Sequence, residues 1–142
     1  MNAELENLST RLETELCAWQ CHGGGSAGDG DDPVSGFANR AIMAHLISAF
    51  HCAAIIFFYR RVRQLNSLLL WPYLEKFLCS LEEFKVEQRK VSLVNCGIVW
   101  PGFIASAEAL DPDLQARFHE HLQDCAKSSR MRNFEFAASL LK

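Results

Sequence analysis

The longest apolar stretch of the chain covers residues 38–63 and reads ANRAIMAHLISAFHCAAIIFFYRRVR. Apolar positions occur on almost every side of the helix it would form, and it closes with Tyr59, Arg60, Arg61 and Arg63. A helix that is apolar all round is either a membrane span or the central helix of a packed bundle. The choice between these two decides the fold class.

Residues 41–59 of this stretch would form a helix about 28 Å long, which is nearly the thickness of a bilayer core. However, His45, Ser48 and His51 lie in its middle, and polar side chains at that depth disfavour insertion. The neighbouring segments also have amphipathic faces that need a soluble partner. The pattern therefore favours a buried central helix over a membrane span.

Several other segments carry apolar residues at three- and four-residue steps, which is typical of amphipathic helices. In the first segment, Leu5, Leu8, Leu12, Leu16 and Trp19 share one face, which we expect to be buried. The sequence thus predicts an all-α fold, an irregular bundle of six to seven helices around the central apolar helix. The expected helices cover residues 3–21, 35–63, 72–84, 101–110, 112–127 and 133–142.

Prolines and polar residues mark several helix ends. Asn66 begins a short apolar turn, and Pro72 fits the first turn of the helix that follows. Asp111 fits the cap position before Pro112, where its side chain can accept hydrogen bonds from free backbone N–H groups. The charged residues 85–90 are expected to form a frayed helix end and a loop.

Residues 22–34 are rich in glycine and aspartate and cannot hold a helix or a strand. A phosphate-binding loop would need a preceding strand and a Lys-Ser/Thr pair, and a calcium loop would need a closing glutamate. The segment has none of these. We therefore expect a flexible loop between an amphipathic N-terminal helix, residues 1–21, and a helical domain, residues 35–142.

Charge and cysteine usage narrow the function classes. The net charge of −3 gives no basic footprint for nucleic acid. The acidic, amphipathic N-terminus lacks the basic and then apolar order of a signal peptide. The cysteines are scattered without a CxxC pair, which predicts reduced, buried thiols in an intracellular protein. They are Cys17, Cys21, Cys52, Cys79, Cys96 and Cys125.

A polar seam follows one side of the central helix, formed by His45, Ser48, Cys52 and Tyr59. These residues either line a small-molecule pocket or pack between helices with their polar atoms hydrogen-bonded, and the second arrangement is favoured. Glu108 is a lone carboxylate in an apolar helix. No second carboxylate lies near it for acid–base chemistry, so we expect it to form an ion pair or a helix cap.

An enzyme would need convergent polar groups, and no nucleophile–base spacing joins the candidates. His119 and His121 are two residues apart and point to different faces of a helix, which is poor spacing for joint metal binding. We therefore expect no catalytic residues, no metal and no cofactor. The candidates considered are His45, His51, Tyr59, Glu108, His119 and His121.

The segment 100–118, WPGFIASAEALDPDLQARF, resembles the regulatory domain of fungal zinc-binuclear-cluster (Zn2Cys6) transcription factors, in the subfamily of the arginine-metabolism regulator. In that family a Trp-Pro-x-Phe-Ile-Ala motif runs into a Glu-Ala pair, and an apolar helix like the one ending in Tyr59, Arg60 and Arg61 precedes it. Asn133 matches a later Asn that opens a further helix. The matching motif residues are Trp100, Pro101, Phe103, Ile104, Ala105, Glu108 and Ala109.

The resemblance covers residues 35–142 and implies the C-terminal part of a fungal-specific transcription factor domain. It implies a nuclear, regulatory role in transcription through protein partners or self-association, with a small-molecule effector as a further option. The family's DNA-binding module needs six closely spaced cysteines around two zinc ions, and the scattered cysteines here do not provide it. We therefore expect no direct DNA binding by this chain.

Two alternatives stay beside this interpretation, a small helical enzyme and a membrane-associated helical protein that uses residues 41–59. The sequence does not specify the effector, the pathway or the target genes. If the chain is only part of the family domain, one side of the central helix lacks a partner. We then expect exposed apolar surface along that helix or along the last helix, and a tendency to self-associate.

Overall fold

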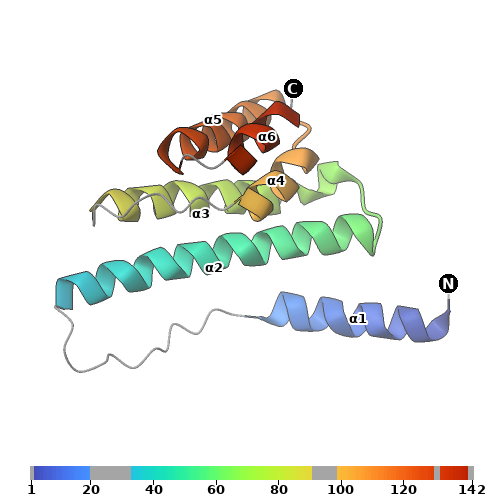
Figure 1. Ribbon diagram of the computed structural model, residues 1–142. Coiled ribbons are helices and arrows are strands. Elements are labelled where there is room, and N and C mark those ends of the chain that lie inside the picture. Colours follow the sequence, from blue (N-terminus) through green and yellow to red (C-terminus); the bar gives the residue numbers. More distant parts are fainter. Residues whose placement is uncertain (1, 20–32, 91–98, 130–131, 141–142) are drawn as a thin grey trace.

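A computed structural model describes residues 2–19, 33–90, 99–129 and 132–140. The described residues form six α-helices and one 3₁₀ turn, with no β-strand, so the all-α prediction is confirmed (Figure 1). The elements are α1 (Ala3–Ala18), α2 (Pro33–Arg61), η1 (Ser67–Leu70), α3 (Trp71–Lys90), α4 (Val99–Glu108), α5 (Pro112–Ser129) and α6 (Arg132–Leu140).

Helix α2 is the central helix of the bundle, as its apolar composition predicts. It lies between α1 on one side and α3 on the other, and it also packs against α4 (Figure 1). Helices α5 and α6 pack against each other and cover α4. The 22 residues from Arg40 to Arg61 are long and apolar enough to span a membrane, but 39% of this segment is already buried inside the protein.

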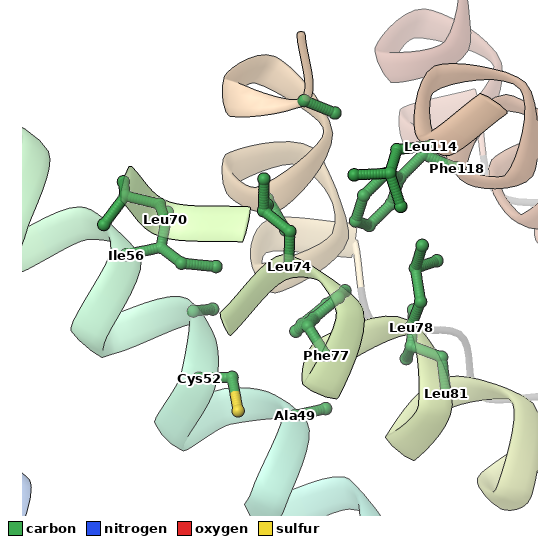
Figure 2. Packing of buried hydrophobic residues seen from close by; sticks show 13 residues of the cluster. Ala49, Cys52, Ile56, Leu70, Leu74, Phe77, Leu78, Leu81, Leu114 and Phe118 are labelled. Atoms are coloured by element: carbon green, nitrogen blue, oxygen red, sulfur yellow. The ribbon is translucent and has the colours of Figure 1, made fainter. Parts of the chain in front are cut away.

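The main core forms where α2, α3 and α5 meet (Figure 2). Ile56 of α2 lies beside Leu70 of η1, and Cys52 of α2 and Phe77 of α3 belong to the same buried cluster. The Phe77 ring lies 5.8 Å from the Phe118 ring of α5. The close approach of α2 and α3 depends on small side chains, since Ala49 is completely buried. A smaller core between α5 and α6 contains Leu122, Cys125, Ala137 and Ala138.

The predicted turn and cap residues hold their expected positions. The Asn66 side chain accepts a hydrogen bond from the Leu68 N–H at 3.0 Å, and Pro72 lies in the first turn of α3. The Asp111 side chain accepts hydrogen bonds from the N–H groups of Asp113 and Leu114. These side chains satisfy backbone donors that have no partner within the helix.

The prediction for residues 85–90 is wrong, because α3 continues to Lys90 instead of ending in a loop. The extra turns are held by tertiary contacts: Phe84 and Gln88 are buried, and Lys85 forms an ion pair with Asp124 of α5 at 3.3 Å. Local charge density indicated a loop, but packing against α5 decides the length of the helix.

The prediction that the leucine face of α1 is buried is also wrong. Leu5, Leu8 and Leu12 are 57%, 58% and 50% exposed. Polar contacts hold α1 against α2 instead, and the main one is Arg63, which binds Glu6 at 2.8 Å and Glu13 at 2.5 Å.

The expected glycine-rich loop, residues 22–34, lies outside the described residues except at its end, where α2 already begins at Pro33. Cys21 and Cys96 also lie outside them. Of the described cysteines, Cys52 and Cys125 are buried as predicted, whereas Cys17 and Cys79 are exposed, which contradicts the expectation of buried thiols.

Candidate functional site

Helix α4 carries most of the Trp-Pro motif and lies across α2. The side chains that it turns inward are small. Pro101, Ala105 and Ala109, which directly follows the helix, are buried, and Ala105 is completely buried. Ile104 packs against the main core and Phe103 against the smaller one. The small residues allow α4 to approach α2 closely, and the two larger ones anchor it to both cores.

Glu108 joins the last turn of α4 to the end of α2. Its carboxylate accepts hydrogen bonds from Arg60 Nε at 2.5 Å and from Ser67 Oγ at 2.6 Å. Arg60 also donates to the carbonyl oxygen of Leu65 at 2.5 Å. The Glu108 side chain is only 16% exposed, so these partners compensate the charge that burial removes from water. The ion pair expected for Glu108 is thus present.

Tyr59 and Arg61, which flank Arg60 at the end of α2, make different contacts. The Tyr59 hydroxyl lies 3.6 Å from Cys17 Sγ of α1, and its ring lies 6.0 Å from the Tyr73 ring of α3. The contact with Cys17, together with partial burial and the nearby Glu13 carboxylate, raises the pKa of the Tyr59 hydroxyl. Arg61 is exposed in the last turn of α2.

Trp100 stands apart from the other motif residues because half of its surface is exposed. Its ring lies 6.3 Å from the ring of Phe57 of α2. Trp100 also lines two neighbouring grooves. One, between α1 and α2, has a volume of about 560 Å³, and the other, between α4 and α6, has a volume of about 430 Å³.

These two grooves and the side chains around them form one apolar surface, which we call the Trp100 face. It extends from α1 across α2 and α4 to α6, with Trp100 in the middle. Its large apolar members are all 42–67% exposed. They are Leu12 of α1, Trp19 directly after α1, Phe50 and Phe57 of α2, Trp100 of α4, and Phe136 and Leu140 of α6.

Few polar groups interrupt this face. In the groove between α1 and α2 they are Glu15 and His51. His51 is already engaged, because its Nε2 lies 2.7 Å from the carbonyl oxygen of Leu16 and its ring lies 4.8 Å from the Trp19 ring. Such a surface suits an apolar partner more than a charged one.

The predicted polar seam of α2 packs between helices, as favoured from the sequence. Ser48 shares a hydrogen bond of 3.0 Å with Ser80 of α3, and His45 lies 3.0 Å from Glu83. Cys52 is buried in the core, where burial raises the pKa of its thiol.

A buried histidine, His121, lies in α5, away from the Trp100 face. Burial, together with the nearby Lys85 ammonium, lowers the pKa of His121 to about 4. Its Nε2 lies 3.5 Å from Cys125 Sγ, and burial raises the pKa of that thiol to about 11. Both groups are neutral at neutral pH.

The candidate catalytic residues do not meet at one site. His51, His119 and His121 line three different cavities. Glu108 is bound to Arg60 and Ser67, and His45 faces Glu83. Tyr59, the sixth candidate, contacts Cys17. A nucleophile and its base need to lie within hydrogen-bond distance, and no contact in the described part of the chain joins one of these six residues to another.

Comparison with known proteins finds the same family that the Trp-Pro motif of α4 resembles. Residues 1–142 match the family described as fungal specific transcription factor domain. The chain belongs to this family. It is also similar to Arginine metabolism regulation protein II of the yeast Saccharomyces cerevisiae, with 29% identity over 126 residues. The match covers 86% of this chain and 13% of that protein, and no solved structure matches the chain.

The resemblance predicted from the Trp-Pro motif is therefore confirmed, and the family match extends to the N-terminal helix, which the resemblance did not include. By this match the chain is a transcription factor domain.

The sequence did not indicate the contact between Phe57 and Trp100 or the binding of Arg63 to α1. One signal was available for the second: Glu6 and Glu13 are seven residues apart and lie on one side of the first helix.

Proposed function

We propose that this chain works in a nuclear transcription regulator as a protein-contact module, without catalysis and without binding DNA itself. The observation that carries the proposal is the Trp100 face. Exposed apolar patches above a few hundred Å² mark interaction sites in soluble proteins. At about 200 Å² for one aromatic side chain, the five aromatic residues of this face alone expose roughly 500 Å².

Charge supports a protein partner over nucleic acid. The chain carries a net charge of −3, whereas DNA-binding surfaces concentrate Lys and Arg along a groove or helix. Arg60 and Arg63, at the end of α2 and just after it, are already bound to carboxylates. Arg117 is likewise bound to Glu75 and Glu82.

A membrane role is less consistent with the contacts of α2. The helix is apolar enough to span a bilayer, but one side of it forms the main core with α3. Insertion would remove Cys52 and Ile56 from the core that they share with α3 and break the Ser48–Ser80 hydrogen bond. The exposed side of α2 belongs to the Trp100 face.

A reporter assay tests the proposal. The chain is fused to an unrelated DNA-binding domain in a fungal cell, and transcription from its operator is measured. We expect the fusion to change transcription severalfold and Trp100→Ala to abolish the change. Trp71→Ala is the matched control, because Trp71 is 43% exposed but lies at the start of α3.

Equal reporter output from both variants, with their helical content intact by circular dichroism, would contradict a role for the Trp100 face. A gel-shift assay of the unfused chain with genomic DNA fragments tests the second part of the proposal, that the chain does not bind DNA. A specific shifted complex would contradict the absence of DNA binding.

A further inference from the structure

The exposed face of α1 has a symmetric pattern. The five apolar residues Leu5, Leu8, Leu12, Leu16 and Trp19 are separated by steps of three, four, four and three residues. The pattern is therefore the same read in either direction from Leu12. The four leucines lie in α1, and Trp19 is its C-terminal cap residue, whose N–H still donates to the carbonyl oxygen of Glu15 at 3.0 Å. At helical spacing these steps keep the five side chains in one stripe. We call this stripe the α1 ridge.

The contacts between α1 and α2 leave most of the ridge open. Glu6 and Glu13 bind Arg63, and Ser9 is buried, so α1 meets α2 along a flank beside the ridge. Leu5, Leu8 and Leu12 remain at least half exposed as a result.

Helix α2 adds a second stripe on the same side of the molecule. Met43, Phe50 and Phe57 are spaced by seven residues and are 52%, 45% and 42% exposed. Leu12 and Phe50 line the same groove, which shows that ridge and stripe border one another. Helices α1 and α2 run in opposite directions side by side (Figure 1). Together they present one half of a four-helix arrangement.

The exposed area matches what a dimer needs. A standard interface takes about 800 Å² from each partner, of which about 60% is apolar, or roughly 500 Å². At about 200 Å² for one aromatic side chain, and slightly less for Leu or Met, the exposed parts of the ridge and the stripe amount to roughly 600 Å².

We propose that the occupant of this surface is a second copy of the chain, with the two α1 ridges antiparallel about a two-fold axis at Leu12. A two-fold axis requires the same patch on both copies to be self-complementary. The symmetric spacing satisfies this requirement: Leu12 faces Leu12, Leu8 faces Leu16, and Leu5 faces Trp19 of the second copy. The Met43–Phe57 stripes then face each other beside the ridges.

Charge is compatible with the same register. Arg11, which is exposed, comes within one turn of Glu15 of the second copy, on the side of the ridge away from α2. Arg11 pairs with Glu15 of its own chain at 3.0 Å, so each copy offers an acid–base pair to the other. A parallel pairing would instead place the acidic residues Glu4 and Glu6 level with their own copies.

This inference deepens the proposed function, because it names one partner for the α1–α2 part of the Trp100 face. The groove between α4 and α6, lined by Trp100, Phe103, Phe136 and Leu140, is not used by the two-fold contact. It stays available to another protein.

Sedimentation equilibrium over a range of concentrations tests the dimer. We expect the chain to approach twice the mass of one copy, and Leu12→Glu to weaken association at least tenfold, since it sets two like charges face to face on the axis. Leu69→Glu is the matched control: Leu69 is 64% exposed but belongs to η1, and it should leave association unchanged. A chain that stays monomeric, or equal weakening by both variants, overturns the proposal.

Cross-linking tests the position of the axis. Under mild oxidation, Leu12→Cys should form a disulfide-linked dimer, whereas Leu5→Cys, which faces Trp19, should not exceed the wild-type level. All three proteins keep the native thiols, so the difference reports the new cysteine. Equal cross-linking of both variants would overturn the antiparallel register even where the mass shows a dimer. A monomer that is still active in the reporter assay would refute this inference alone, and a dimer that is silent there would refute only the proposed function.

Discussion

The Glu108 ion pair gives a quantitative test of how the motif region holds α4 on α2. Glu108→Ala removes an acceptor used by both Arg60 Nε and Ser67 Oγ. A hydrogen bond to a charged group contributes about 1.5–3 kcal/mol when buried. Glu108 is 16% exposed but Arg60 is 34% exposed, so solvent screening lowers the contribution of the pair. We expect the free energy of unfolding to fall by about 2 kcal/mol.

The measurement is urea unfolding followed by circular dichroism at 222 nm, with Glu108→Gln and Arg60→Met as companions. Glu108→Gln keeps an acceptor for Ser67 and should cost about 1 kcal/mol. In a double-mutant cycle, Glu108→Ala and Arg60→Met should show a coupling energy of about 1 kcal/mol, because each removes the partner of the other. Lys90→Met, which breaks the surface i,i+3 pair with Glu87, is the control and should cost less than about 0.5 kcal/mol.

A coupling energy below about 0.3 kcal/mol would refute the reasoning. It would mean that Arg60 is held by the Leu65 carbonyl alone and that Glu108 does not join α4 to α2.

Three further predictions follow from buried groups. Phe77→Ala, at a completely buried site, should cost about 3–5 kcal/mol in a urea titration, whereas Val86→Ala on exposed α3 surface should cost under 1. Between pH 6.5 and about 4 the unfolded chain binds a proton at His121 and the folded chain does not. The free energy of unfolding should therefore decrease by up to about 3 kcal/mol as the pH is lowered through this window, and His121→Gln should make this decrease smaller. Iodoacetamide should alkylate exposed Cys17 at least ~100-fold faster than Cys125, as followed by mass spectrometry.

The sequence determined the helices and most of their ends. Apolar spacing identified each helix, and Asn66, Pro72 and Asp111 marked their starts because capping chemistry is local. It also determined the family, through an ordered set of motif residues. The length of α3 was missed because the residues that hold its last turns, Lys85 and Asp124, are distant in sequence.

The candidate site depended far more on the tertiary structure. Periodicity shows that a helix has an apolar face, but it does not show which partner covers that face. Leu5, Leu8 and Leu12 were expected in a core, yet Arg63 holds α1 by its polar flank and leaves them open. The predicted exposed surface on the central and last helices is confirmed at Phe50 and, on α6, at residues 136 and 140.

The sequence by itself thus determined that α2 is apolar all round, and the tertiary structure decided which side of it is core. The main core takes Cys52 and Ile56, because α3 and η1 pack over them. Phe50 and Phe57 on the opposite side are left beside Trp100. Local pattern specifies hydrophobicity residue by residue, whereas burial is a property of pairs of elements, so only the assembled helices separate a core face from a face open to a partner.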